Sequence, residues 1–165
     1  MSSITIETYD TTVVITTRAP QLTVLEALEI APAANARQAG YTITDEGTVI
    51  DNTSGLEWQR TPFAGEMPWD AAASACKELR LAGHEDWRMP TRVELLTLVD
   101  DTRFDPAIDA DAFPDTPTKW FWTSTPAARA PSAVAWIVRF ANGSSGFARR
   151  DGHHRVRAVR GASRQ

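Results

Sequence analysis

The stretch GHEDWRMPTRVELLTLVD, residues 83–100, decides the fold of this chain. Pro90 ends its first half, and Thr91 and Glu94 then stand three residues apart, directly before an apolar series. This spacing is a capping box, in which the Thr91 hydroxyl accepts a hydrogen bond from the Glu94 amide and the Glu94 carboxylate accepts one from the Thr91 amide. The stretch therefore predicts a helix from Thr91 to Asp101.

A second short helix is predicted just before this stretch. Apolar residues recur there at helical spacing, and Gly83 suits the position that follows a helix end. Next to it, Asp86, Trp87 and Arg88 put an aromatic ring between opposite charges, and we expect Trp87 and Arg88 to lock both helices against an antiparallel sheet. The recurring apolar residues are Trp69, Ala72, Ala73, Cys76 and Leu79.

Short apolar runs separated by turn residues predict the strands of that sheet. Asn52 and Gly55 are expected to supply the positive φ angles of a tight turn between strands at 47–52 and 54–58. Asn142-Gly143 is a hairpin signal between two later strands. Helices early and an antiparallel sheet late indicate the α+β class. The later strand candidates are 120–124, 133–140, 145–149 and 155–160.

Residues 1–40 differ from the rest and are expected to form an N-terminal arm. Apolar residues alternate with polar ones on either side of a turn at 10–11, which predicts a β-hairpin, and a helix is predicted over 22–36. Because the arm has few apolar residues, we expect it to pack on the main domain (residues 41–165), on a sister subunit or on a larger assembly.

The bulk composition narrows the class of protein. A chain of 165 residues with 42% hydrophobic content suits one domain with an appendage. No apolar run reaches the ~18 residues of a membrane span, and the N-terminus lacks the pattern of a secretory signal. We expect synthesis in the cytoplasm and incorporation into a virion or another extracellular particle.

The order of the motifs resembles the Lcl C-terminal domain family over about residues 45–160. The resemblance implies a C-type-lectin-like domain with two helices and a twisted antiparallel sheet. It also implies binding of sulfated polysaccharide and assembly as a trimer, and related domains form receptor-binding tips on phage tails. The motifs are Gly47-Thr48-Val49, Gly55-Leu56-Glu57-Trp58-Gln59, Gly83 to Pro90, Phe113-Pro114, Trp122-Thr123-Ser124-Thr125, Ala135-Trp136-Ile137-Val138 and Val156-Arg157-Ala158-Val159-Arg160.

The chain departs from the family's pattern in lacking one cysteine. Members often close with a cysteine that pairs with the helix cysteine, and this chain has Ala158 at that position. Cys76 therefore has no intrachain partner, and we expect it to be a buried small hydrophobic residue in a protein that matures in a reducing compartment.

Catalysis is not expected, and no catalytic residue is assigned. Formylglycine-generating enzymes share the lectin-like fold, but the familiar type needs two cysteines, and iron-dependent relatives need three histidines at one metal. His153 and His154 are adjacent and would point to opposite faces of a strand, so with His84 they do not make that site. A formylglycine-generating-like enzyme is thus the least favoured alternative.

A run of aspartates leaves one cofactor question open. Residues 100–117 are rich in Asp and Pro and predict a long irregular loop. Clustered carboxylates suit calcium, but their spacing is not that of an EF-hand loop, and capping and turn formation without a metal are favoured. No other cofactor is expected. The aspartates are Asp100, Asp101, Asp105, Asp109, Asp111 and Asp115.

The charge is uneven along the chain. Residues 129–165 hold eight arginines and one acid, whereas the whole chain has a net charge of −4. Such a basic stretch suits an anionic ligand, or it pairs with acids inside the fold or across a subunit contact. Nucleic acid is not an expected partner, because the overall charge is negative and no helix carries the arginines into a groove.

The candidate ligand-binding residues lie mainly at one polar hairpin tip, where arginine forks suit sulfate, phosphate or carboxylate. The alternative for this tip is a solvated turn whose arginines contact a neighbouring subunit. The candidates are Trp120, Asn142, Arg149, Arg150, His153, His154 and Arg155.

Six tryptophans are many for this length, and an exposed ring offers a face on which a sugar can stack. We expect Trp58, Trp69, Trp87 and Trp136 in the core, and Trp120 at a loop exit is the best exposed candidate. The residues expected to carry the fold are Trp58, Asp86, Trp87, Arg88, Pro90, Glu94, Trp122 and Trp136.

These inferences favour a non-enzymatic binding or adhesion module. It is expected to recognise carbohydrate or a cell-surface receptor as part of a phage virion or a similar assembly, and to form a homo-oligomer, with a trimer favoured. The alternative is a structural decoration or attachment protein of a virion that has no ligand of its own.

Overall fold

The computed structural model describes residues 4–9, 12–17 and 40–161, which belong to two separate compact units. In the first unit, β1 (Ile4–Tyr9) and β2 (Thr12–Thr17) pair antiparallel, with Ile6 opposite Ile15. This confirms the expected hairpin. The helix predicted over 22–36 lies outside the described residues.

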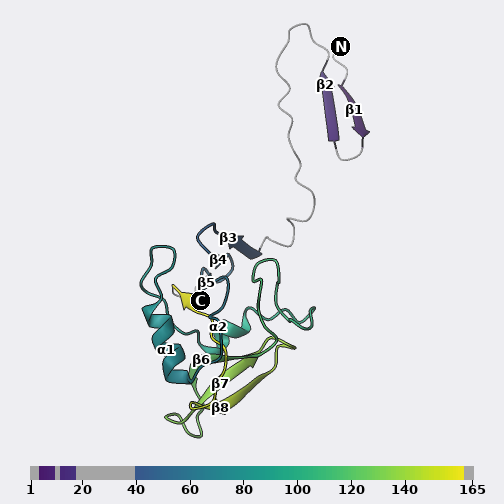
Figure 1. Cartoon of the computed structure of the whole chain (residues 1–165). Coiled ribbons are helices and arrows are strands. Elements are labelled where there is room, and N and C mark those ends of the chain that lie inside the picture. The colour runs from purple at the N-terminus through teal and green to yellow at the C-terminus, as the bar shows by residue number, and fades with distance from the viewer. Residues whose placement is uncertain (1–3, 10–11, 18–39, 162–165) are drawn as a thin grey trace. The chain divides into compact units, whose positions relative to one another are not determined.

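The second unit contains two antiparallel sheets and two short helices (Figure 1). One sheet has the order β3-β4-β5-β9, and the other has the order β6-β7-β8. The α+β class is confirmed. The first sheet consists of β3 (Tyr41–Ile43), β4 (Thr48–Asp51), β5 (Glu57–Gln59) and β9 (Val159–Arg160). The second consists of β6 (Trp120–Pro126), β7 (Val134–Arg139) and β8 (Ser145–Arg149).

The sequence had suggested that the last strand joins the late sheet, but β9 pairs with the early sheet, and only Arg155 of the predicted strand forms an isolated parallel bridge with Phe121 of β6. Only Val159 and Arg160 of the predicted strand 155–160 are extended in a ladder, and Val159 pairs with Trp58 of β5. Val159 also exchanges both backbone hydrogen bonds with Arg88, at 2.9 Å each. The end of the domain therefore closes the early sheet beside the 83–100 stretch.

Each face of the β6-β7-β8 sheet is covered by a different helix. Side chains alternate along β7, so Ala135 and Ile137 pack with the α1 (Trp69–Glu78) residues Ala72 and Cys76. Val138 packs on the opposite face with Leu95 of α2 (Arg92–Leu96). Helix α2 has only five residues, so it covers only part of its face of the sheet.

The capping box of α2 forms as predicted and is joined by an arginine. The Thr91 hydroxyl accepts from the Glu94 amide at 3.2 Å, and the Glu94 carboxylate accepts from the Thr91 amide at 2.8 Å. Arg88 donates to both oxygens of the same carboxylate, at 2.8 and 2.6 Å, and to the carbonyl of Gly161 at 3.1 Å. Glu94 thereby ties α2 to Arg88, whose backbone pairs with β9.

Trp87 fixes the other helix. Its ring is only 2% exposed and packs in the cluster that includes Ala72 and Cys76 of α1. Its indole N–H donates to the Leu81 carbonyl at 3.1 Å. Trp87 and Arg88 thus contact the two helices, but Arg88 pairs with β9 of the early sheet and not with the late sheet that the sequence had suggested. Burial also raises the pKa of the Cys76 thiol to about 12, in keeping with the expected core cysteine.

Three local predictions were wrong. Helix α2 ends at Leu96 rather than Asp101, because the amides of Thr97, Leu98 and Val99 bond to carbonyls three residues back instead of four. Gly83 does not follow the end of α1, which stops at Glu78. It forms a tight turn with Ala82, and both have positive φ.

The third error concerns the turn after β4. Gly55 has positive φ and Asn52 does not. The Asp51 carboxylate shapes this turn instead, because it accepts from the amides of Thr53 and Ser54 at 2.9 and 3.3 Å.

The 100–117 loop is held by packing rather than by regular structure. Ile108 and Phe113 are fully buried in the core. Arg157 is also fully buried, and its guanidinium donates to the carbonyls of Gln59 and Arg60 and to the Thr116 hydroxyl. Its guanidinium also lies 4.7 Å from the centre of the Phe113 ring. Arg157 is thus a structural link between this loop and the end of the first sheet.

We predict that Glu94→Ala lowers the free energy of unfolding by about 2 kcal/mol, because it removes both the helix cap and the paired partner of a half-buried arginine. Urea denaturation measures this change. Glu78→Ala, at an exposed position of α1, is the matched control and should change stability by no more than about 0.5 kcal/mol. Equal effects of the two substitutions would contradict the central role of Glu94.

The same carboxylate predicts a dependence on pH. Burial raises the pKa of Glu94, but hydrogen bonds from Arg88 and Thr91 more than offset this, so its pKa lies below the ordinary value. The stabilisation is therefore complete above the unfolded pKa of about 4.3 and is lost as the pH falls through the lower folded value. Denaturation of wild type and Glu94→Gln from pH 7 to pH 2 should show a stability difference that shrinks only under acidic conditions. A difference that stays constant to pH 2 would refute this linkage.

Candidate binding site

The two arginines of the predicted tip have different surroundings. Arg149 is exposed and forms a fork with Asp151, with distances of 3.1 and 2.8 Å. Arg150 is half-buried, its guanidinium lies 3.8 Å from the centre of the Trp69 ring, and it donates to the Pro131 carbonyl at 2.9 Å. Of the two, Arg149 has the side chain that a ligand can reach more readily.

The next three candidates are held mainly by the domain itself. The His154 ring packs edge-on against Trp122, with 4.6 Å between ring centres, and burial lowers its pKa. Arg155 donates to the Phe63 carbonyl at 3.0 Å. His153 is exposed. The structure does not gather these side chains around one point with Arg149, and ligand binding by them stays a prediction.

The remaining candidates, Trp120 and Asn142, lie in separate surroundings. Trp120 is half-buried and packs against the α1 side of the core. Asn142 is exposed, and its side-chain oxygen accepts from the amide and hydroxyl of Ser144, which shapes the β7–β8 hairpin. Gly143 at this turn has positive φ, and a Cβ there would lie 2.5 Å from a methyl of Val99. The hairpin signal is confirmed.

The aspartate loop shows capping geometry. Asp100 accepts from the Thr102 amide at 2.9 Å, and Asp109 accepts from the Asp111 and Ala112 amides at 3.0 and 3.3 Å. Over the described residues, no three histidine, cysteine or acidic side chains stand close enough together to hold a metal ion.

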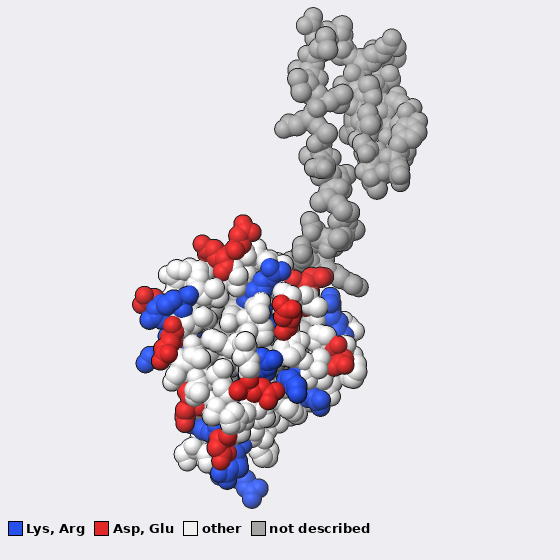
Figure 2. All heavy atoms as spheres, viewed as in Figure 1, with Lys and Arg blue, Asp and Glu red and all other residues white. Residues whose placement is uncertain are grey.

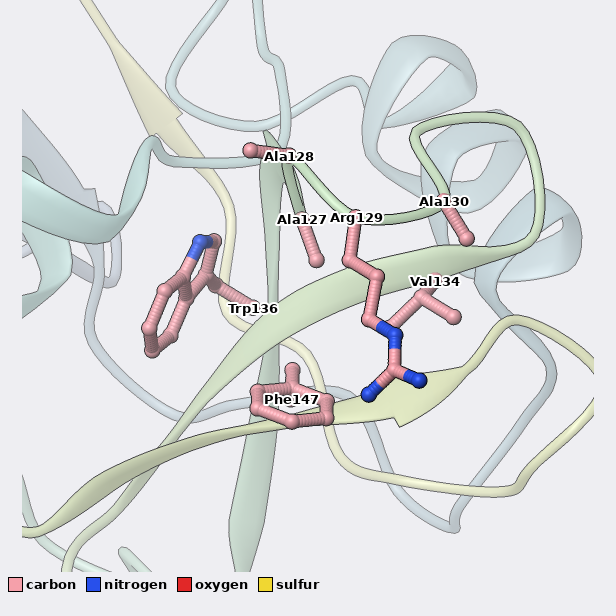
Figure 3. A pocket seen from close by; sticks show the side chains of 7 residues that line it. All are labelled: Ala127, Ala128, Arg129, Ala130, Val134, Trp136 and Phe147. Carbon is pink, nitrogen blue, oxygen red and sulfur yellow. The ribbon is translucent and has the colours of Figure 1, made fainter.

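A pocket of about 470 Å³ lies on the α2 side of the β6-β7-β8 sheet, and sequence reasoning did not find it. Figure 3 shows Trp136 and Phe147 on neighbouring strands, with the 127–130 segment across from them. The pocket is within the usual size range of small-ligand sites. Its lining residues are Ala127, Ala128, Arg129, Ala130, Val134, Trp136 and Phe147.

Strand register and a short loop explain the pocket. Trp136 pairs with Phe147 and Val134 pairs with Arg149, so these four side chains share one face of the ladder. The segment before β7 is closed by backbone bonds from Ala127 to Val134 at 3.0 Å and from Val134 to Ala130 at 2.9 Å. This turn places three alanines beside the aromatic pair and leaves a hollow between them.

Trp136 is only half-buried, so its predicted place in the core was wrong. Trp58 and Trp87 are in the core as expected, and Trp69 is half-buried at its edge. Trp136 lies on the same face of β7 as Val134 and Val138, beside the start of the short helix α2, where the guanidinium of Arg92 stacks 4.0 Å from its ring centre. The alternation of Val134, Trp136 and Val138 with Ala135 and Ile137 was the available signal that β7 has two apolar faces.

The pocket is apolar but carries a cation at its edge. Arg129 is the one charged lining residue and is exposed. Within the described part of the chain, its guanidinium has no hydrogen-bond or ion-pair partner. Phe147 is 63% exposed although it is a large apolar side chain. An aromatic surface beside a free guanidinium is suited to a ligand that has both an apolar group and a negative charge.

Elsewhere, charges of both signs are mixed. On the face that Figure 2 shows, acidic and basic side chains are interspersed over the second unit. Arg160 of the basic C-terminal stretch pairs with Asp86 at 2.7 Å and also with Glu57, both from the acidic part of the sequence. Part of the charge imbalance along the chain is therefore neutralised inside the fold.

The chain belongs to the Lcl C-terminal domain family, because the sequence model of this domain matches residues 47–160, well over half of the chain. The resemblance seen in the motifs is thereby confirmed. The family is not known as an enzyme family, and the match to it indicates a domain of a surface or adhesin-like protein. None of the curated proteins is significantly similar to the chain. No helix in the described residues has the length and apolar character required to span a bilayer.

We predict that the two adjacent arginines of the tip differ in their effect on stability. Arg150→Ala should lower the free energy of unfolding by about 1 to 2 kcal/mol, because it removes the stacking on Trp69 and the bond to the Pro131 carbonyl. Arg149→Ala should leave it nearly unchanged, since the ion pair of Arg149 is exposed to solvent. Thermal unfolding of both variants measures the difference, and equal stability of the two variants would contradict the predicted structural role of the Arg150 contacts.

Proposed function

We propose that this domain is a non-enzymatic recognition module with a C-type-lectin-like fold. It binds a carbohydrate or a receptor on a cell surface, as part of a phage virion or a similar particle. The observation that carries the proposal is the pocket beside Trp136 and Phe147, which joins exposed aromatic surface to the unpaired Arg129. The family membership supports a surface or adhesin-like role.

The ligand-binding face consists of the pocket together with Arg149. Arg149 stands two residues from Phe147 on β8, so both side chains project from the same face of the sheet. Aromatic residues and arginines at the centre of an interface often contribute most of the binding free energy in protein complexes. The sequence-predicted Arg149 and the structure-derived pocket therefore belong to one surface.

Assembly as a homo-oligomer, with a trimer favoured, is part of the same proposal. Strand β8 is at the edge of its sheet, and within the described residues no strand pairs with its outer side. None of its five residues is buried. Native proteins usually protect such edges, and contact with a neighbouring subunit is one way to do so.

A structural attachment role is the second candidate function. It is favoured by Val93 and Phe104, which are 73% and 77% exposed and do not line the pocket. Exposed apolar side chains of this kind suit contacts with other proteins of a particle. In that case the domain would attach to its neighbours without binding a cell-surface ligand.

We predict that Phe147→Ser weakens binding to the surface ligand about thirtyfold, as expected for the loss of an aromatic anchor worth about 2 kcal/mol. The labelled full-length protein is tested on a printed glycan array and on a panel of intact bacterial cells. Val93→Ser is the control, because it removes another exposed apolar side chain that lies outside the pocket. Unchanged binding of Phe147→Ser would refute the proposed site, and absence of binding to every glycan and cell would favour the structural role.

A further inference from the structure

The chemistry of the pocket limits what can enter it. The lining side chains are two aromatic rings, one valine, three alanines and Arg129, so their hydrogen-bonding groups are the Arg129 guanidinium and the indole N–H of Trp136. Both groups donate hydrogen bonds and accept none. A sugar ring carries several hydroxyl groups that each need partners when they leave water, and these side chains do not supply them. The pocket therefore selects against a polyhydroxylated ring as its occupant, so of the two ligand classes in the proposed function it favours a cell-surface receptor over a bare carbohydrate.

The same lining favours an apolar body. Burial of apolar surface against Trp136, Phe147 and Val134 is stabilising in proportion to the area removed from water. A volume of about 470 Å³ admits a group of the size of an aromatic ring with a short chain. An apolar group of this size can also pack against the methyl groups of the three alanines, whose side chains have no hydrogen-bond donors.

The charges on and around the pocket select the sign of the ligand. Arg129 belongs to the lining, and Arg92 lies against the ring of Trp136, so two guanidinium groups are close to the apolar surface. No acidic residue is part of the lining. In Figure 3 the Arg129 side chain extends from the 127–130 segment in the direction of Phe147, which places its donors along the pocket wall. A carboxylate next to the apolar body can accept two parallel hydrogen bonds from such a fork.

We propose that the pocket binds an apolar group joined directly to a carboxylate, and that Arg129 receives the carboxylate while Trp136 and Phe147 hold the apolar group. This inference rests on the proposed function, because it uses the same pocket and names the chemical class of the group that the surface ligand inserts there. Both a free organic acid and the apolar C-terminal residue of a polypeptide have this chemistry.

Chemical-shift titrations of the isotopically labelled full-length protein test the proposal with small probes. N-acetylphenylalanine carries both features, its amide lacks the charge, and glucuronate lacks the apolar body. We expect N-acetylphenylalanine to bind with a Kd of about 1 mM and with shifts around Trp136 and Phe147. The amide should bind about fivefold more weakly, and glucuronate should not bind in the pocket.

A peptide that ends in -Val-Phe, prepared with a free or an amidated C-terminus, distinguishes the two sources of this chemistry. If the natural ligand is a polypeptide C-terminus, the peptide with the free end should bind more tightly than N-acetylphenylalanine. If the natural ligand is a free acid, it should not.

A pair of variants isolates the role of the arginine. Arg129→Gln should weaken N-acetylphenylalanine about fivefold and leave its amide unchanged. Lys77→Gln, at an exposed position of α1 on the other side of the sheet, removes the same charge elsewhere and should change neither affinity. Equal affinities of the acid and the amide in wild type, or tighter binding of glucuronate, would overturn the inference.

The outcomes for this inference and for the proposed function can be told apart. If Phe147→Ser abolishes attachment to cells but the apolar acid does not bind, the recognition site stands and the ligand class is wrong. If the acid binds through Arg129 but Phe147→Ser leaves attachment to cells unchanged, the pocket chemistry stands and the proposed function fails.

Discussion

The fold depends on one carboxylate. The Glu94 carboxylate accepts hydrogen bonds from the amide and hydroxyl of Thr91 and from two nitrogens of the Arg88 guanidinium. It thereby completes the cap of α2 and joins that helix to the segment that pairs with β9. Helix α2 has only five residues, and a helix of that length has little stability of its own in water. Its position over the sheet is therefore set by this cluster of hydrogen bonds together with the burial of Leu95.

The position at which α2 begins has a direct consequence for the binding surface. Leu95 packs with Val138 of β7, but only the side chain of Arg92, the first residue of the helix, reaches Trp136, and Val134 lines the pocket beyond it. The 127–130 turn then forms the other wall of the hollow. Val99, three residues past the last residue of α2, lies against Gly143 at the β7–β8 turn, so a longer helix would extend away from the pocket. The Thr91 cap, where α2 begins, therefore limits how far the helix covers this face.

Much of the fold was predictable because its signals are local. The capping box, the β7–β8 hairpin at Asn142-Gly143 and the core positions of Trp58 and Trp87 depend on neighbouring residues or on simple periodicity. The site was less predictable. Arg149 was found as a fork-shaped donor, but its neighbour Arg150 has the same chemistry in the sequence and differs only because Trp69 lies against it. The partnership of Arg129 with Trp136 and Phe147 joins a turn to two strands and has no local signal.

The sequence by itself determined the family, the α+β class and the capped helix, since these follow from the order and spacing of residues that interact with near neighbours. Tertiary structure alone decided that β9 closes the early sheet, that Arg157 is buried among carbonyls, and that Trp136 borders a pocket instead of the core. Each of these depends on which face of a strand another segment covers. Side chains on a strand alternate between two faces, and the sequence does not state how far along each face a helix will reach.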